Sequence, residues 1–273
     1  MAIITVSREL AALGDETAHE LAKQLNYRFI DRQVLEGRIK SYGMVDSKLE
    51  KYDERKPSFW ASLSQGRDDY VHFLKTAIYA EAGEGNCVFI GRGAGIALEN
   101  VPGVVSVFLV APLGIRLERV RSYFQSDEKR ARQVIEQSDR DRTGFHRYFF
   151  DTEWKDSANY HLSLNTGYLH PTACADIVKI FMGHNISREV ELQGLGRIKE
   201  LTLAQKVKHC IIYEKEIPIN FLEAAVSGGC ITLYGVAGSQ SLVETALAAA
   251  REVASPAQVQ SEIQIVQEYN MMH

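Results

Sequence analysis

The sequence predicts an α/β protein in which a parallel sheet is flanked by helices, followed by a small α+β domain. Up to about residue 182, short apolar segments rich in β-branched residues alternate with helical segments. This alternation is typical of a parallel sheet that is covered on both faces. Beyond about residue 200 the order changes to helix, strand, strand, helix and strand, which predicts a separate domain.

Four apolar segments are expected to form strands of the parallel sheet. They are Ile3–Val6, the first half of "NCVFIGRGAG", "GVVSVFLVAP" and "YHLSLNTGYL". The helix after the first strand carries Ala18, Leu21, Ala22 and Leu25 on one face. A second helix is expected over about 69–82, and a charged helical stretch over roughly 115–150.

The rest of the chain is expected to form a linker over 183–199 and a domain over 200–273, after a first domain over 1–182. The linker holds three glycines and lacks a sustained apolar period. A helix over about 202–213 then precedes two strands joined by a Gly-Gly turn. The next helix is predicted to open with a capping box from Ser241 to Glu244, and "VQSEIQIVQEY" predicts a closing strand.

Composition and charge exclude several classes of protein. Hydrophobic residues make up 45% and charged residues 24%, as in ordinary globular proteins. The formal net charge of −4 argues against a general nucleic-acid binder, which needs a basic surface. Four widely spaced cysteines favour free thiols in a reducing compartment. Without a signal peptide or a membrane-spanning apolar run, a cytoplasmic protein is expected.

The stretch "SRELAALGDETAHELAKQL" stands where a phosphate-binding loop would lie, between a strand and a helix. In a Walker A loop, glycines turn backbone N–H groups toward phosphates, a lysine neutralises charge and a hydroxyl holds Mg²⁺. When Gly14 is aligned with the second glycine, Glu9 takes the place of the first. Asp15 and Glu16 then stand at the lysine and hydroxyl positions, with Thr17 one residue late.

Asp15 and Glu16 also have an ordinary structural interpretation. Acidic residues in a first helical turn complement the helix dipole, and Asp15 could accept N–H bonds as a helix cap. We therefore favour the cap over a catalytic role for these two residues.

The order of several motifs resembles the cytidylate kinase-like family of bacterial proteins, relatives of the nucleoside monophosphate kinases. The motifs are "SRE" with Gly14, "FIDRQVLE", "VFIGRGAGIAL", "VFLVAPLGIRLERV", "SDRDRTGFHRYFF" and "NYHLSLNTGYL". The likeness covers about residues 1–182 and rests on their order and spacing. It implies a P-loop fold and transfer of a phosphoryl group from ATP with Mg²⁺ to a nucleoside monophosphate or similar small acceptor.

The resemblance also implies roles for individual residues. Ser7, Arg8, Gly14 and Thr17 belong to the loop that would hold the donor's β-phosphate. Asp31 and Arg32 match the stretch near the acceptor, and Arg92 matches an arginine that grips the acceptor's phosphate. Arg116 and Arg119 match the helix at the donor site. Asp139, Arg140 and Arg142 match the lid that closes over the transferring group. Arginine suits such roles because its fork binds phosphate oxygens in a bidentate way and keeps its charge.

Simpler interpretations of these residues stay open. Arg92 could cap a carbonyl or pair with a carboxylate. Arg140 and Arg142 lie in a run of mixed charge, which usually forms a solvated helix face. Asp31 could be a turn residue before the next helix.

The loop departs from the family pattern, which usually reads "GSGG" plus a basic residue. Here it reads "AALG" plus Asp15. Each missing glycine narrows the access of the backbone to positive φ. The change of charge also removes the cation that faces the β- and γ-phosphates, a loss that commonly costs about two to three orders of magnitude in rate.

The tail, over about 200–270, resembles a BON domain through "GGCITLYGVAG", a helix of small apolar residues and "AQVQSEIQIV". BON domains are associated with binding of ligands or phospholipid surfaces and with regulation. Ser255-Pro256-Ala257 replaces the family's usual Gly-Val before the last strand, so only the fold is carried over. A dimerisation or interaction module is an equal alternative.

Two hypotheses for the function follow. The first is a cytidylate kinase-like phosphotransferase that binds ATP, Mg²⁺ and a small nucleotide. The second is a pseudokinase that binds no ATP and recognises a ligand or protein partner through both domains. The order of the motifs favours the first hypothesis, and Asp15 and Glu16 favour the second for present-day activity.

Overall fold

The computed structural model describes residues 2–45 and 66–266 of the chain. These residues form two compact units, of which the first ends at Leu195 and the second begins at Gly196. None of the helices in these two ranges combines the length and the apolar character that crossing a membrane requires.

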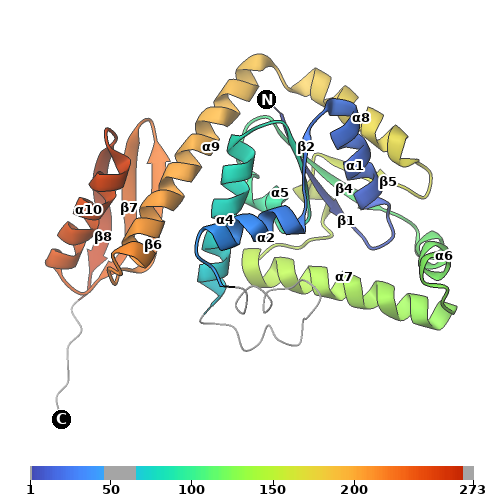
Figure 1. The fold of residues 1–273 in the computed structure, drawn as a ribbon, viewed down its shortest axis with the longest axis horizontal. Helices are drawn as coiled ribbons and strands as arrows, with labels where there is room; N and C mark the ends of the chain where they lie inside the picture. Colours follow the sequence, from blue (N-terminus) through green and yellow to red (C-terminus); the bar gives the residue numbers. More distant parts are fainter. Residues whose placement is uncertain (1, 46–65, 267–273) are drawn as a thin grey trace, which may run out of the picture. The chain divides into compact units, whose positions relative to one another are not determined.

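The first unit contains a parallel sheet, as the alternation of strands and helices predicts, but the sheet has five strands and not four (Figure 1). Its strands are β1 (Ile3–Arg8), β2 (Arg28–Ile30), β3 (Cys87–Ile90), β4 (Val104–Val110) and β5 (Leu162–Asn165). The strand that the sequence pattern misses is the short segment Arg28–Ile30. The spatial order is β2-β3-β1-β4-β5, so β1 is the central strand. Loops that follow β1, β3, β4 and β5 therefore meet at one edge of the sheet, where ligands bind in folds of this kind.

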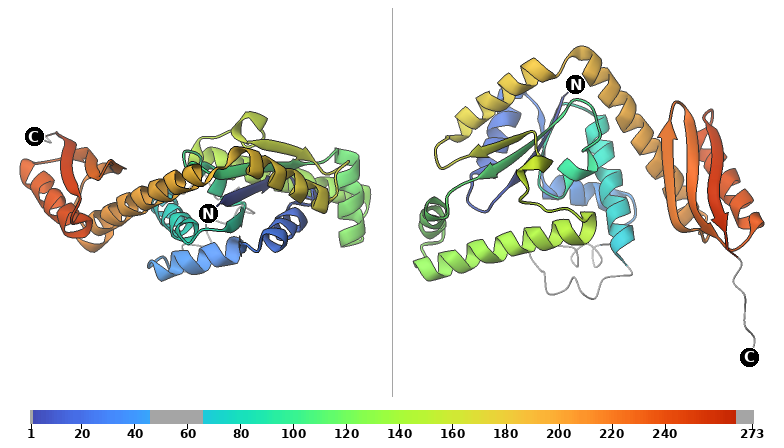
Figure 2. Two further views of the ribbon diagram at one scale, coloured as in Figure 1. Left: turned by 90° about the horizontal axis from the view of Figure 1, so that it is seen from above. Right: turned by 180° about the vertical axis from the view of Figure 1, so that it is seen from behind.

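Helices cover both faces of this sheet (Figures 1 and 2). They are α1 (Gly14–Leu25), α2 (Arg32–Ser41), α4 (Arg67–Gly83), α5 (Ala94–Ala97), α6 (Leu113–Phe124), α7 (Glu128–Phe150) and α8 (Pro171–Asn185), with a 3₁₀ turn at Ser157–Asn159. On one face α1 and α8 bury Leu21, Ala18 and Val178 against Ile4 and Val107 of the sheet. The predicted apolar face of α1 is thus a core face.

The charged stretch over 115–150 forms two helices where the sequence pattern predicts one region. Helix α6 ends at Phe124 because Gln125 adopts a left-handed conformation with φ of 48°. Helix α7 then starts afresh, since the Asp127 carboxylate caps it by accepting a hydrogen bond from the N–H of Arg130. The continuous polarity of the stretch hides this break.

The segment 183–199, which we expect to be a linker, is almost entirely helical. Helix α8 continues to Asn185, and α9 (Arg188–His209) begins three residues later. A Cβ on Gly194 would lie 2.1 Å from the carbonyl oxygen of Pro102, so this glycine allows a close approach of helix to loop. Glycine here serves packing, which is why the sequence pattern looks loose.

The second unit has the predicted order of helix, strand, strand, helix and strand. After α9 and a π-helical turn at Cys210–Glu214 come β6 (Asn220–Ser227), β7 (Cys230–Ala237), α10 (Gln240–Ala254) and β8 (Gln258–Ile265). In the sheet, β7 pairs antiparallel with β6 and parallel with β8. Helix α10 is capped by Ser239, whose Oγ accepts from the N–H of Leu242. The predicted capping box at Ser241 is therefore wrong by two residues.

The glycine pair in α9 provides a test of the packing explanation. Gly194→Ala should lower the melting temperature, because its methyl group would collide with the Pro102 backbone oxygen. Gly196→Ala is the matched control. It has open space around it and should gain about 1 kcal/mol of helix stability. Circular dichroism melting curves of both variants measure the effect. Equal changes in melting temperature, relative to the wild type, would contradict the close approach of Gly194 to Pro102.

The four free thiols provide a second test. Cys87, Cys174 and Cys210 are buried and Cys230 is half-buried. Burial raises the pKa of the Cys87 thiol to about 12, so almost no reactive thiolate exists at pH 8. Ellman's reagent should therefore modify Cys230 first in the native protein, and the other three only in denaturant. Rapid modification of the native Cys230→Ser variant would contradict this burial.

Candidate functional site

The loop after β1 leads from the central strand directly into α1. It comprises residues 9–13, and both Ala11 and Leu13 have left-handed backbone conformations, with φ of 61° and 53°. A Cβ on Gly14 would lie 2.3 Å from the Cγ of Arg8. The Arg8 side chain therefore lies across the beginning of α1, in space that only a glycine at position 14 leaves open.

Asp15 and Glu16 do not cap α1, contrary to the interpretation from sequence. The N-cap residue is Leu13, and no side chain makes a cap hydrogen bond there. Because the helix begins at Gly14, both acids lie within its first turn, beyond the cap position. Asp15 is exposed, and its carboxylate lies 3.5 Å from the Arg8 guanidinium. The two acids therefore complement the helix dipole without closing the loop.

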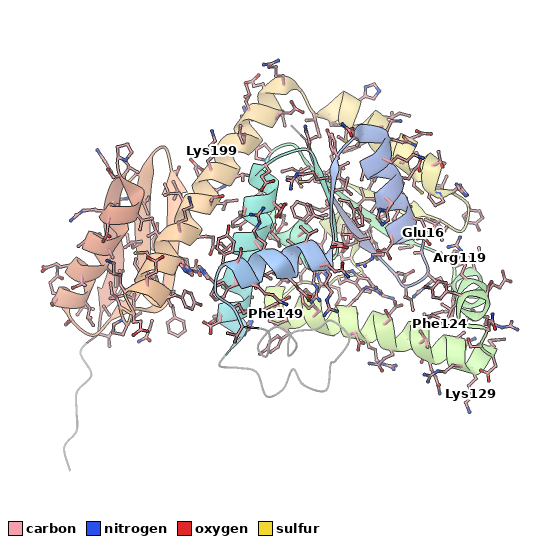
Figure 3. The ribbon with its side chains drawn as sticks, viewed as in Figure 1. Glu16, Arg119, Phe124, Lys129, Phe149 and Lys199 are labelled. Carbon is pink, nitrogen blue, oxygen red and sulfur yellow. The ribbon has the colours of Figure 1, made fainter. Side chains whose placement is uncertain are left out.

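Two arginines of α6 bind the outer, carbonyl side of the loop. Arg116 donates from Nε to the oxygen of Leu10 at 2.8 Å, and Arg119 donates to the oxygen of Ala11 at 2.9 Å. Figure 3 shows Arg119 projecting from α6 toward the end of the loop where α1 begins. Thr166, after β5, donates its hydroxyl to Ala12 and accepts from Arg119. The loop is thus held by residues that follow two other strands, namely the α6 arginines after β4 and Thr166 after β5.

An ion-pair cluster lies beside this loop and consists of Glu9, Arg116, Asp139 and Lys155. The buried Arg116 guanidinium lies 3.1 Å from Glu9 and binds both carboxylate oxygens of Asp139 at 2.8 and 3.0 Å. The Lys155 ammonium lies 3.1 Å from Glu9 and 3.0 Å from Asp139. Burial alone would lower the pKa of Lys155, but these two carboxylates outweigh it and raise the pKa. Two cations and two carboxylates balance one another.

A groove of about 440 Å³ opens next to the cluster, between α7 and Lys155. Its lining residues are Asp139, Arg140, Thr143, Gly144, Arg147 and Lys155. Arg140 is 62% exposed and donates to Gln137, while Arg147 pairs with Glu153. Arg142 does not line this groove, and its guanidinium binds the Ser138 hydroxyl at 2.8 Å. The groove therefore presents three cations and one carboxylate.

The residues expected near an acceptor gather around Glu36, apart from the loop. Arg92 is buried with φ of 55°, and its guanidinium lies 3.1 Å from a Glu36 oxygen and 3.4 Å from the Tyr70 hydroxyl. Arg32 donates to the same Glu36 oxygen at 2.6 Å. Asp31 caps α2 by accepting from the N–H of Val34. Arg92 thus pairs with a carboxylate and Asp31 lies at the turn before the next helix, which are the simpler interpretations of these two residues.

Ser7 lines a second, smaller cavity of about 90 Å³, together with Gly95, His146 and Tyr160 among others. Burial raises the pKa of the Tyr160 phenol, and a hydrogen bond from Ser7 partly offsets that rise. Thr17 is buried and donates its hydroxyl to the oxygen of Leu13 at 2.7 Å. Neither hydroxyl is directed at the groove beside α7. The described residues also hold no group of three or more His, Cys, Asp or Glu side chains arranged to bind a metal ion.

Three residues that organise these sites are not among the residues expected from the sequence: Lys155, Thr166 and Glu36. Thr166 lies in the "NTG" stretch after a strand, and Glu36 is the last residue of the motif "FIDRQVLE", so both have a local signal. Lys155 follows Trp154 in an irregular segment and has none. Only the tertiary structure brings Lys155 to the loop, 146 residues away in sequence from Glu9.

The ion-pair cluster should contribute to the stability of the folded protein. Arg116→Met should cost about 3 kcal/mol of unfolding free energy, because Glu9 and Asp139 then share only the Lys155 ammonium and the Leu10 carbonyl loses its donor. Arg140→Met on the exposed face of α7 is the control and should cost roughly 0.5 kcal/mol or less. Chemical denaturation followed by tryptophan fluorescence measures both. A small loss for Arg116→Met would mean that the cluster contributes little.

Comparison with solved structures supports the fold of the first unit. A crystal structure of an uncharacterized protein from Eubacterium ventriosum is 20% identical, with a TM-score of 0.53, and covers 67% of this chain and 99% of that one. Shikimate kinase from Bacteroides thetaiotaomicron is 16% identical, with a TM-score of 0.41, and covers 67% of this chain and 98% of its own. The likeness to the first of these concerns the fold alone.

Comparison with protein families is more specific. No curated protein sequence matches the chain. Residues 199–267 match the BON domain, and residues 3–168 match the cytidylate kinase-like family, both in the order that the sequence motifs predict. The match to the cytidylate kinase-like family spans the whole parallel sheet, the loop after β1 and the groove beside α7. This chain therefore belongs to the cytidylate kinase-like family.

Proposed function

We propose that the first unit binds a small phosphorylated molecule, such as a nucleoside monophosphate, in the groove beside α7 and does not transfer phosphoryl groups from ATP. The observation that carries this proposal is the commitment of the donor-side cations to the protein itself. Arg116 binds Leu10, Glu9 and Asp139, and Arg119 binds Ala11 and Thr166. Neither guanidinium is left to neutralise a triphosphate.

The charge and size of the groove support a phosphorylated ligand. A volume of about 440 Å³ falls within the range of small-molecule sites. Three of its lining side chains, Arg140, Arg147 and Lys155, are cationic, and each stays more than 40% exposed although it also pairs with a carboxylate. Exposed cationic side chains in a concave site attract an anion that can replace their carboxylate partners, and arginine forks match phosphate oxygens.

ATP with Mg²⁺ does not fit the loop after β1. The position of the lysine is taken by Asp15, whose carboxylate would meet the β- and γ-phosphates as a like charge. The hydroxyl of Thr17 is bound to Leu13, and the carboxylates of Glu9 and Asp139 are held by Arg116 and Lys155. We therefore assign no step of a reaction to Mg²⁺ or to ATP.

A second candidate function is the phosphotransferase itself, and one observation favours it. In the described part of the chain, no group accepts a hydrogen bond from the N–H groups of residues 13–16, and the Arg8 guanidinium lies beside them. N–H groups at a helix N-terminus bind phosphate oxygens. In this candidate Ser7, Arg8, Gly14 and Thr17 would form the donor loop. Arg92, with Asp31 and Arg32 nearby, would hold the acceptor's phosphate, and Arg140 and Arg142 would close the lid.

For the second unit we propose a regulatory role in binding a ligand or a protein partner. Its sheet presents large exposed aromatic side chains, with Phe221 86% and Tyr234 45% exposed. Exposed aromatic residues are common anchors in binding surfaces.

Titration calorimetry of the full chain with CMP, and separately with ATP and Mg²⁺, tests the two candidates. Saturable heat with CMP and none with ATP is the expected result. Saturable binding of both, followed by formation of ADP, would establish the phosphotransferase instead. The absence of heat with either nucleotide, from folded protein, would reject the phosphotransferase and would reject CMP as the ligand of the groove.

Asp15→Lys tests the explanation for the lack of ATP binding. Replacing the carboxylate with an ammonium should raise ATP affinity at least about tenfold, which corresponds to ~1.4 kcal/mol. Asp176→Lys, an identical change on the exposed side of α8, controls for overall charge. Unchanged ATP affinity in Asp15→Lys would show that residue 15 does not decide binding.

A further inference from the structure

We propose that Lys155 supplies the ammonium group that the loop after β1 lacks. It would do so by exchanging its contact with Glu9 for one with an oxygen of the ligand's phosphoryl group. This inference rests on the proposed binding of a phosphorylated molecule in the groove, and it names the residue and the exchange by which binding occurs.

The position of Lys155 is the first argument. It belongs to the segment after α7, yet its Nζ lies 3.1 Å from Oε1 of Glu9, the first residue of the loop. The same side chain lines the groove and is 44% exposed. Its ammonium therefore stands between the loop and the groove, within reach of a ligand in either.

The base of the Lys155 side chain is fixed, although its end is accessible. The preceding residue, Trp154, is 1% exposed, and its carbonyl oxygen accepts a hydrogen bond from the Tyr160 hydroxyl at 2.9 Å. The ammonium lies 5.5 Å from the centre of the Trp154 ring. Rotation about the flexible lysine stem can therefore move the charge without moving the backbone.

The exchange leaves no buried carboxylate without a partner. If Lys155 moves, Glu9 keeps the Arg116 guanidinium at 3.1 Å and the N–H of Ala111 at 3.4 Å. Asp139 keeps both of its hydrogen bonds from Arg116. Arg116 could not move in the same way, because it is buried and also binds the oxygen of Leu10. Lys155 is thus the cation of this cluster that is able to change partners.

The chemistry of the groove selects a phosphoryl oxyanion as the new partner. Arg140 and Arg147 line the same groove and place two more exposed guanidinium groups there, paired with Glu136 and Glu153. A lysine ammonium binds phosphate as a compact point charge, in the way that a loop lysine does in nucleotide-binding proteins. The alternative is a purely structural role, in which Lys155 only holds the segment after α7 against Glu9. The experiment must distinguish this role from ligand binding.

Calorimetric titration of full-length protein with inorganic phosphate and with CMP separates the two roles. Lys155→Met should weaken binding of both by about tenfold, and Lys155→Arg should restore most of the affinity. Lys129→Met, at the exposed start of α7, is the matched control and should bind like the wild type. Glu9→Gln should strengthen binding about threefold to tenfold, because it removes the carboxylate that competes for the ammonium.

The inference requires both weaker binding in Lys155→Met and stronger binding in Glu9→Gln. Wild-type binding that is unchanged in Lys155→Met, with only a lowered melting temperature, overturns the inference and leaves the proposed function standing. Phosphate binding by Glu9→Gln but not by the wild type would mean that Lys155 stays with Glu9 in the natural protein, which overturns the exchange together with the proposed function. Absence of binding in both folded proteins overturns both proposals.

Discussion

The buried guanidinium of Arg116 is the interaction on which the rest of the candidate site depends. It joins three parts of the chain that are distant in sequence: the loop carbonyl of Leu10, the Glu9 carboxylate and the Asp139 carboxylate on α7. A charge with so little exposure is tolerated only because each of its three nitrogens lies within 3.1 Å of an oxygen. The position of the loop, the orientation of α7 and the base of the groove all follow from that requirement. A site built in this way is organised by its own anions before any ligand arrives.

Family membership and loop chemistry therefore describe different things about this chain. Residues 3–168, which carry the parallel sheet and the loop after its central strand, match the cytidylate kinase-like family. The charges at the loop differ from what a triphosphate needs, since Asp15 stands where a cation is expected. A fold can be retained while its site changes, because packing of the sheet does not involve the loop's charges. The packing of Leu21, Ile4 and Val107 in the core does not depend on which ligand binds at the strand ends.

Periodicity predicts the parallel sheet and the second unit, because the apolar strands and the face of α1 are repeating local patterns. It does not predict the break between α6 and α7, where one backbone conformation at Gln125 interrupts continuous polarity. It also misses the helical state of 183–199, where Gly194 is required by a contact with Pro102 that no local pattern encodes. At the site, the family resemblance points to Arg116 and Arg119 as residues near the loop after β1. The carboxylates and carbonyls that they bind depend on the tertiary fold, as does the arrival of Lys155.

The packing of Arg8 against Gly14 has a consequence for how such loops evolve. Glycine in a strand-to-helix loop is usually taken as a sign that a phosphate approaches the backbone there. In this chain the space beside Gly14 is filled by the protein's own Arg8 side chain. Selection can then preserve the glycine for this packing alone, and a larger residue becomes acceptable only when position 8 carries a smaller side chain. Positions 8 and 14 should accordingly change together among relatives, and a glycine at this position is by itself a poor marker of nucleotide binding.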